Sequence, residues 1–315
     1  MILVTGATGT VGREVVRGLL EGPEDAGRLV RIMARDPGRV TGPGGTGRGR
    51  TAETTAGDYR DPVSLARALA GVRTAFLVTN RVGGDDDAEF LRAARAAGVR
   101  RVVKLSAAAV LDPDADDAIT RWQRVTEEQL RSSGMEWTLL RPRSFMSNTL
   151  SWATSIRCER VVRALYGTSA NACVDPRDIA EVAVRALTEE RHAGRAYTLT
   201  GPEAISAAEQ TEQLGRVLGV PLRLTELTRD QARVAWSRRH PAEVVEALLR
   251  SADRQRAGGK AQVDETVRAV TGRPAGTFGA WALDHRGAFG RAAADSDTDT
   301  GAGAVRRDVR VGAGG

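Results

Sequence analysis

The stretch Met1-Ile-Leu-Val-Thr-Gly6-Ala-Thr-Gly9-Thr-Val-Gly12 decides the fold. Residues 2–5 are β-prone and end in three glycines spaced three apart, and the apolar spacing of residues 11–20 that follows is that of an amphipathic helix. A strand, a glycine turn and a helix in this order bring unpaired backbone N–H groups and the positive end of a helix dipole to one point. The stretch therefore predicts a dinucleotide fingerprint: Gly6 makes the turn, Gly9 admits the pyrophosphate and Gly12 lets the helix pack on the strand. The alternative is a glycine-rich turn without a ligand.

Strand and helix patterns alternate after this opening, which predicts an α/β, Rossmann-type, doubly wound parallel sheet. Strands are expected at residues 29–34, 54–57, 74–78, 101–106, 136–140 and 197–200, and helices begin after capping residues at positions 61, 175 and 206. Ligand-binding residues of such sheets follow the carboxyl ends of the strands. Five candidates stand there, namely Gly6, Arg35, Asp58, Thr79 and Ser106.

We expect three parts along the chain. Residues 1–150 form an NAD(P)-binding Rossmann domain, residues 151–290 a smaller C-terminal α/β substrate lobe, and residues 291–315 a disordered tail. The tail consists mainly of Ala, Asp, Thr, Gly and Arg, so it cannot bury enough apolar surface to order itself.

Composition limits the partners and the compartment. The chain of 315 residues carries a net charge of +6 and two cysteines without metal-ligand spacing, so no metal is expected. No apolar run approaches the ~20 residues that span a bilayer and no signal peptide precedes the first strand, so we expect a cytoplasmic protein without a membrane partner. Arginines concentrate between Arg28 and Arg50, beside the second strand, which favours a nucleotide over a nucleic acid as the phosphate partner. A homodimer stays open.

Arg35 ends the second strand, at the position that selects the dinucleotide in these folds. An acidic residue there bonds the ribose 2′-OH of NAD, whereas an arginine accommodates the 2′-phosphate of NADP. Arg35 therefore predicts that NADP(H) is preferred, and the neighbouring Asp36 keeps NAD(H) open. The alternative is a solvated arginine in an arginine-rich chain.

Several motifs together make the chain resemble the NmrA-like group of atypical short-chain dehydrogenases/reductases. They are VTGATGTVG (4–12), ARDP (34–37), GDYRDP (57–62), VVKLS (102–106), SGMEWTLLRP (133–142), SFMSN (144–148), VDPRDIA (174–180) and AYTLTGP (196–202). The resemblance implies a Rossmann domain with a substrate lobe. It also implies either reduction of a quinone or enone with NADPH, or NADP(H) sensing without turnover.

The resemblance also implies roles for individual residues. Gly6, Thr8, Gly9, Val11 and Gly12 would hold the pyrophosphate, with Thr10 beside them. The 2′-phosphate would lie at Arg35 and the adenine at Asp58. Thr79, Asn80 and Ser106 would follow the dinucleotide towards the nicotinamide.

The chain departs from this superfamily in its acid–base chemistry. None of its three tyrosines begins a Tyr-x-x-x-Lys pair, the usual proton donor. In the helix before Ser133, where many NmrA-like reductases have His or Lys, this chain has Arg121 and Gln123, which we assign to the substrate pocket. Alcohol oxidation is thereby disfavoured. Reduction of a quinone or conjugated enone remains, because solvent can protonate a stabilised hydroquinone or enolate, while Ser106 or an arginine donates a hydrogen bond to the developing oxyanion.

Two pairs of residues have alternative interpretations. Lys104 shares a strand face with Ser106, so its charge could support the site beneath Ser106. We favour the alternative, in which the side chain extends to the sheet margin and its ammonium is in water. Phe145 and Met146, just beyond a strand end, either line a pocket for a flat hydrophobic substrate or belong to the core.

These observations predict an NADPH-dependent reductase of a quinone or conjugated carbonyl compound, with an aromatic or quinone-like small molecule as substrate and a place in aromatic secondary metabolism. The alternatives are a non-catalytic NADP(H) sensor that binds a regulatory protein, and a non-redox enzyme on the same fold.

Overall fold

The computed structural model describes residues 1–22, 29–39 and 52–290. The tail predicted for residues 291–315 lies outside the described residues. Seven parallel strands form the main sheet, in the order β3-β2-β1-β4-β5-β6-β8. Their bounds are β1 Ile2–Val4, β2 Val30–Ala34, β3 Glu53–Ala56, β4 Thr74–Leu77, β5 Arg101–Leu105, β6 Glu136–Pro142 and β8 Arg195–Leu199. The order reverses at β1, so the predicted Rossmann-type doubly wound sheet is confirmed.

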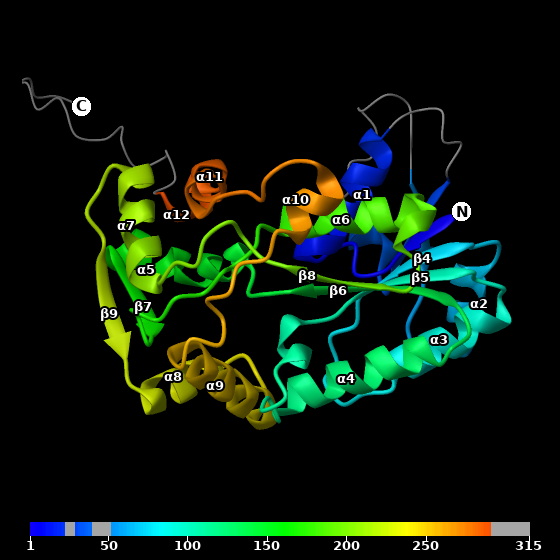
Figure 1. The fold of residues 1–315 in the computed structure, drawn as a ribbon, viewed down its shortest axis with the longest axis horizontal. Helices are drawn as coiled ribbons and strands as arrows, with labels where there is room; N and C mark the ends of the chain where they lie inside the picture. Colours follow the sequence, from blue (N-terminus) through cyan, green and yellow to red (C-terminus); the bar gives the residue numbers. More distant parts are fainter. Residues whose placement is uncertain (23–28, 40–51, 291–315) are drawn as a thin grey trace, which may run out of the picture.

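Helices cover both faces of this sheet (Figure 1). On one face lie α1 (Thr10–Glu21), α6 (Pro176–Thr188) and α10 (Thr266–Thr271), and on the other α2 (Pro62–Leu69), α3 (Asp86–Ala96) and α4 (Ala118–Arg131). The alternation of β1 explains the two cores, since Ile2 and Val4 pack with α1 and α6 whereas Leu3 packs with α2 and α3.

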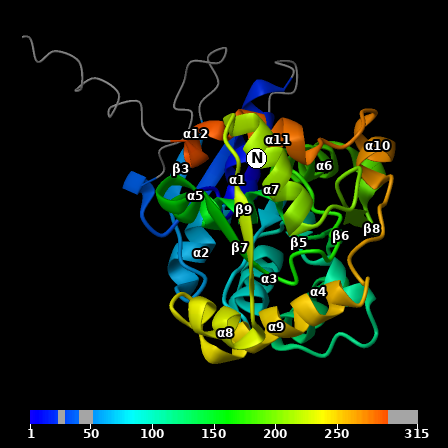
Figure 2. The ribbon, with the colours of Figure 1, turned by 90° about the vertical axis from the view of Figure 1, so that its left-hand side faces the viewer.

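A smaller α/β part stands beyond the carboxyl ends of the main strands (Figures 1 and 2). Its centre is a parallel pair, β7 (Val161–Leu165) with β9 (Arg223–Leu227). Around the pair lie α5 (Ala153–Glu159), α7 (Ala207–Leu218), α8 (Arg229–Ser237), α9 (Ala242–Arg256), α11 (Phe278–Asp284) and α12 (Arg286–Phe289). The 3₁₀ helices are η2 (Pro37–Arg39), η3 (Ala108–Leu111), η4 (Met146–Trp152) and η5 (Glu190–His192).

The main sheet also draws on residues after position 150. Helix α6 packs on α1, and β8 pairs with β6 as the last strand of the sheet. The boundary between residues 1–150 and 151–290 stays a prediction. Helix α6 and strand β8 lie after position 150 in the sequence, but both belong to the layers of the Rossmann sheet.

The predicted helix caps are confirmed. The Asp61 side chain accepts from the backbone N–H of Val63 and Ser64, and Asp175 accepts from Arg177. Ser206 forms a reciprocal capping box at the start of α7. Within the described ranges, no helix combines the length and apolar character needed to cross a bilayer.

Candidate active site

The glycine turn after β1 has the geometry of a dinucleotide loop. Gly6 has φ +64° and lies against Val78, beyond the end of β4, where an added Cβ would approach the Val78 Cβ to 2.9 Å. A Cβ at Gly12 would lie 2.2 Å from the Gly6 carbonyl oxygen. Glycine is therefore required at both positions by the turn and by the close approach of α1 to it.

The amino terminus of α1 is open to a ligand. Gly9 caps the helix without any side-chain hydrogen bond, and the first turn holds no acidic residue. Thr8, Gly9 and Thr10 are exposed, whereas Val11 and Gly12 are buried and can reach a ligand only through their backbone. Free N–H groups at a helix start suit a pyrophosphate, so these residues fit the diphosphate of NAD(P)H.

Arg35 and Asp58 lie at the same edge of the sheet. Ala34 pairs with Ala56, and the Gly57 N–H donates to the Ala34 carbonyl at 3.0 Å. The hydrogen bond from the Arg60 N–H lowers the pKa of Asp58, and the charge of Arg35 contributes in the same direction. Arg35 is exposed at this edge, where it is free to reach a 2′-phosphate. Its predicted contact stays a prediction.

Lys104 contradicts the favoured prediction that its ammonium is in water. The side chain is 0% exposed, and Nζ lies 2.8 Å from a carboxylate oxygen of Asp87, which is 1% exposed. Thr79 joins this pair: its hydroxyl donates to Asp87 at 2.8 Å and accepts from Lys104 at 3.2 Å. The strand pattern around Lys104 could not reveal Asp87, which lies on α3. Because the hydroxyl hydrogen of Thr79 is donated to Asp87, it is not available to a nicotinamide.

Ser106 is also held by a buried charge. Its hydroxyl donates to Glu127 at 2.6 Å, and Arg141 donates to the same carboxylate at 2.9 Å. Burial raises the pKa of Glu127, but the bonds from Arg141 and Ser106 outweigh it and keep the pKa below its usual range. Glu127 is therefore an ionised acceptor, and the single hydroxyl hydrogen of Ser106 is not free for the oxyanion role predicted for it.

A cavity of about 340 Å³ opens beyond the carboxyl ends of β5, β6 and β8. Part of its wall is η3, which begins two residues after Ser106, and another part is the segment that precedes α10. The lining residues are Ala108, Leu111, Asp112, Arg143, Thr198, Gln262 and Asp264. Because ligands of doubly wound sheets bind outside the strand ends, this cavity is the candidate substrate site.

None of the four residues predicted for the substrate pocket lines this cavity. Arg121 is exposed and pairs with Asp116, and Phe145 packs against the core shared by α1 and α6. Met146 is 1% exposed and packs in the core of the smaller part, so the core interpretation holds for it. The buried Oε1 of Gln123 has no hydrogen-bond partner among the described residues, which suits a group that receives a ligand N–H.

Two residues of the site were missed by sequence analysis. Glu127 lies in the middle of a helix, with no local signal. Arg143 follows the carboxyl end of β6 and could have been found by the same position rule that singled out Ser106. Asn80, predicted at the cofactor, is exposed just beyond β4, which leaves its role a prediction.

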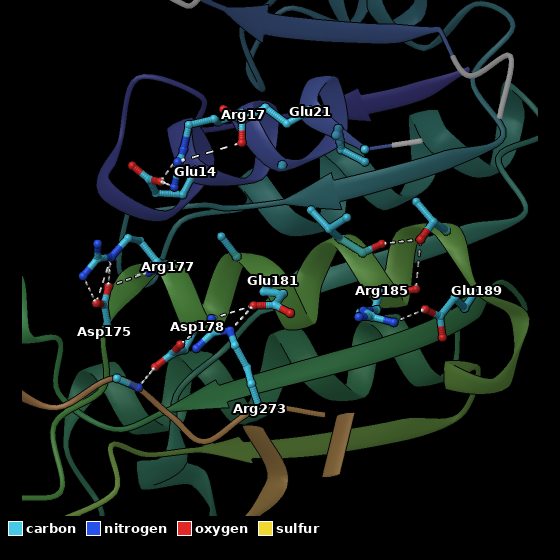
Figure 3. Close-up of a pocket in the computed structure, with 17 residues that line it drawn as sticks. Glu14, Arg17, Glu21, Asp175, Arg177, Asp178, Glu181, Arg185, Glu189 and Arg273 are labelled. Carbon is cyan, nitrogen blue, oxygen red and sulfur yellow. Dashed lines mark hydrogen bonds and ion pairs between the residues drawn. The ribbon is translucent and has the colours of Figure 1, made fainter. Parts of the chain in front are cut away.

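A larger cavity, of about 800 Å³, lies between α1 and α6 (Figure 3). Its arginines are already paired with carboxylates: Arg177 pairs with Asp175 at 2.6 Å, and Arg273 pairs with Asp178 at 2.8 Å. It contains none of the predicted cofactor residues. We therefore assign the active site to the strand ends and not to this cavity.

Known proteins of similar sequence are named for NAD(P)H binding or for reduction. The model of the NAD(P)H-binding family matches residues 6–190. The chain is 56% identical, over 92% of its length and 99% of the relative, to a (4-alkanoyl-5-oxo-2,5-dihydrofuran-3-yl)methyl phosphate reductase of Streptomyces griseus. It is 38% identical, over 93% of its length and 100% of the relative, to an NAD(P)H azoreductase of Xenophilus azovorans.

The fold is shared with a solved NADPH-dependent quinone oxidoreductase of Escherichia coli in complex with NADPH. The TM-score is 0.76 at 24% identity, and the match covers 90% of this chain and 99% of the other. The named relatives are reductases, which does not favour the sensor alternative. The chain therefore belongs to the NAD(P)H-binding family, in the NmrA-like group of atypical short-chain dehydrogenases/reductases, and is an NAD(P)H-dependent oxidoreductase that acts on a small molecule.

Proposed function

We propose that this enzyme reduces the conjugated carbon–carbon double bond of a (4-alkanoyl-5-oxo-2,5-dihydrofuran-3-yl)methyl phosphate, the substrate class in the name of the Streptomyces griseus relative. In such a compound the ring double bond is conjugated with two carbonyl groups, those of the lactone and of the alkanoyl chain. The proposal narrows the predicted class of quinones and conjugated carbonyl compounds to one type of enone.

The observation that carries the proposal is the shortage of a proton donor around the candidate site. Ser106 donates its hydroxyl hydrogen to Glu127, Glu127 is ionised, and Lys104 is buried in an ion pair with Asp87. A reaction that needs a strong general acid is poorly served here. An acceptor that delocalises its new negative charge over two carbonyl groups needs none.

Solvent supplies the proton that the proposed reduction needs. When bound, NAD(P)H would supply the hydride for the ring carbon that bears the phosphorylated methyl group. The substrate electrons move to the neighbouring carbon, where they form an enolate shared by both carbonyl groups, and water supplies the proton. The protein binds and orients: the Gly6–Gly12 turn holds the dinucleotide, and the cavity beside Ala108 and Arg143 holds the substrate.

The cavity lining favours this substrate over a quinone. None of the cavity's lining residues in the described part of the chain is aromatic, so stacking on a flat ring is not provided. Arg143, Asp112 and Asp264 make the wall charged, which suits an oxygen-rich polar substrate better than a quinone. We retain the quinone as the comparison substrate.

The test is turnover by the purified enzyme with NADPH and four acceptors: the butenolide phosphate, its dephosphorylated alcohol, a naphthoquinone and a saturated ketone. We expect NADPH oxidation with the butenolide phosphate and none with the saturated ketone. With NADPH deuterated at the reactive carbon, the product should carry one deuterium on the carbon next to the phosphorylated methyl group. Oxidation with the quinone alone, or a product without that deuterium, would refute the proposal.

A further inference from the structure

We propose that Arg143 determines substrate specificity, through paired hydrogen bonds from its guanidinium to the two carbonyl oxygens of a β-dicarbonyl substrate. The inference rests on the proposed function and deepens it. In the substrate named for the Streptomyces griseus relative, the lactone carbonyl and the alkanoyl carbonyl are bonded to the same ring carbon. Their oxygens can therefore face one donor, and both take up negative charge when the ring double bond is reduced.

Arg143 is fixed at the wall of the candidate substrate cavity. Its backbone N–H donates to the Leu199 carbonyl oxygen at 2.9 Å, just beyond the ends of β6 and β8. The residue lines the cavity together with Asp112 and Asp264, and the charges of these two carboxylates act on its guanidinium. The guanidinium therefore lies outside the strand ends, where doubly wound sheets bind their ligands.

The guanidinium of Arg143 keeps its N–H donors free. Nε is buried without a hydrogen-bond partner, and no hydrogen bond from the terminal nitrogens to another residue is found in the described ranges. A buried donor without a partner is costly in free energy. Its retention at a cavity wall calls for an oxygen atom that arrives with a ligand.

Two carboxylates compensate the charge of Arg143 without taking its hydrogens. Burial lowers the pKa of Arg143, and the negative charges of Asp112 and Asp264 act in the opposite direction. The close contacts of these carboxylates are elsewhere: Asp112 lies 3.5 Å from the guanidinium of Arg254, and Asp264 accepts from the Thr266 N–H at 2.8 Å. A compensated arginine is poorly suited to a permanent anion, whereas its N–H groups can bond neutral carbonyl oxygens.

The shape of a guanidinium matches a pair of carbonyl oxygens. Arginine presents its N–H groups in a rigid planar fork that can bond two oxygens at once. The two oxygens of a β-dicarbonyl enolate lie in one plane and share one negative charge. Because reduction creates that charge, the hydrogen bonds from Arg143 should strengthen as the reaction proceeds and lower its barrier. A compound with a single carbonyl group uses only half of the fork.

The first experiment compares the wild type, Arg143→Gln and Arg143→Lys with two substrates, the alkanoyl butenolide phosphate and the same phosphate without its alkanoyl group. In Arg143→Gln, kcat/KM for the alkanoyl compound should fall roughly 10- to 150-fold, the range for a lost hydrogen bond to a charged group. The loss should be several-fold smaller for the compound with one carbonyl. Arg143→Lys should recover little, because an ammonium lacks the planar fork.

Arg250→Gln is the matched control, because it removes an exposed arginine of α9, and it should behave as the wild type. Circular dichroism verifies that each variant is folded. If Arg143→Gln reduces both substrates with equal losses, or with no loss, the dicarbonyl site is refuted and the proposed function stands. A fall in NADPH affinity in this variant would also refute the site, by assigning Arg143 to the dinucleotide.

Binding measurements separate this inference from the proposed function. In calorimetry with NADP⁺ present, α-acetyl-γ-butyrolactone, which has both carbonyl groups, should bind to the wild type and more weakly to both Arg143 variants. γ-Butyrolactone, which has one carbonyl group, should bind no better to the wild type than to the variants. This result would support the dicarbonyl site even if the butenolide phosphate is not reduced, in which case only the proposed function fails. Equal binding of the acetyl compound to all three proteins would refute the site.

Discussion

Replacement of Lys104 by Met should destabilise the enzyme strongly, because it leaves Asp87 charged and buried without a counter-ion. The pair lies 2.8 Å apart, and both side chains are almost fully buried. With an effective dielectric constant of about 20, the attraction at this distance is about 6 kcal/mol, most of which balances the cost of removing two ions from water. Removal of one partner from such a pair costs about 3–5 kcal/mol of unfolding free energy.

The assay is urea unfolding followed by circular dichroism for Lys104→Met, Asp87→Asn and the double variant. The double variant should lose less than the sum of the single losses, because it leaves no unpaired charge. Arg92→Met is the control, since Arg92 pairs with Glu89 on the exposed face of α3 and should cost at most about 1 kcal/mol. A Lys104→Met loss no larger than this control, or fully additive losses, would refute the reasoning. The kcat of the folded double variant should change little, because both charges of the pair are removed together.

Three further predictions concern the dinucleotide and the buried carboxylate. Gly12→Ala should weaken NADPH binding in calorimetry, because the added Cβ would lie 2.2 Å from the Gly6 carbonyl oxygen. Gly287→Ala is the control and should bind NADPH as the wild type does, because an added Cβ there has nothing within 4 Å. Equal NADPH affinities of the two variants would contradict this prediction. Arg35→Ala should lower NADPH affinity by about 1.5–3 kcal/mol and leave NADH nearly unchanged, and equal losses for both would reject a 2′-phosphate contact. The lowered pKa of Glu127 means that its carboxylate stabilises the fold fully above 4.5, the ordinary value, and loses this contribution as the pH falls through the lowered pKa. The difference in unfolding free energy between wild type and Glu127→Gln should therefore shrink in acid, and a pH-independent difference would argue against an ionised Glu127.

The local sequence determined the fold class and the dinucleotide loop. The turn from Gly6 to Gly12 is readable because its strand, glycines and helix are contiguous, so each requirement acts between near neighbours. The caps at Asp61, Asp175 and Ser206 were predictable for the same reason, since each side chain bonds a backbone N–H two or three residues away. Resemblance to a family added the cofactor and the reductase class, which the comparisons support.

Only the tertiary structure decided the substrate side of the site. Lys104 pairs with Asp87 on α3 and Ser106 bonds to Glu127 on α4, so a strand pattern could indicate a shared face but not these partners. Arg143 follows β6 and Asp264 follows α9, and the two residues line one cavity although they are far apart in the sequence. Charged groups that are distant in the sequence shift each other's pKa, and lose water, only when folding brings them together. The sequence near each group therefore does not reveal these interactions.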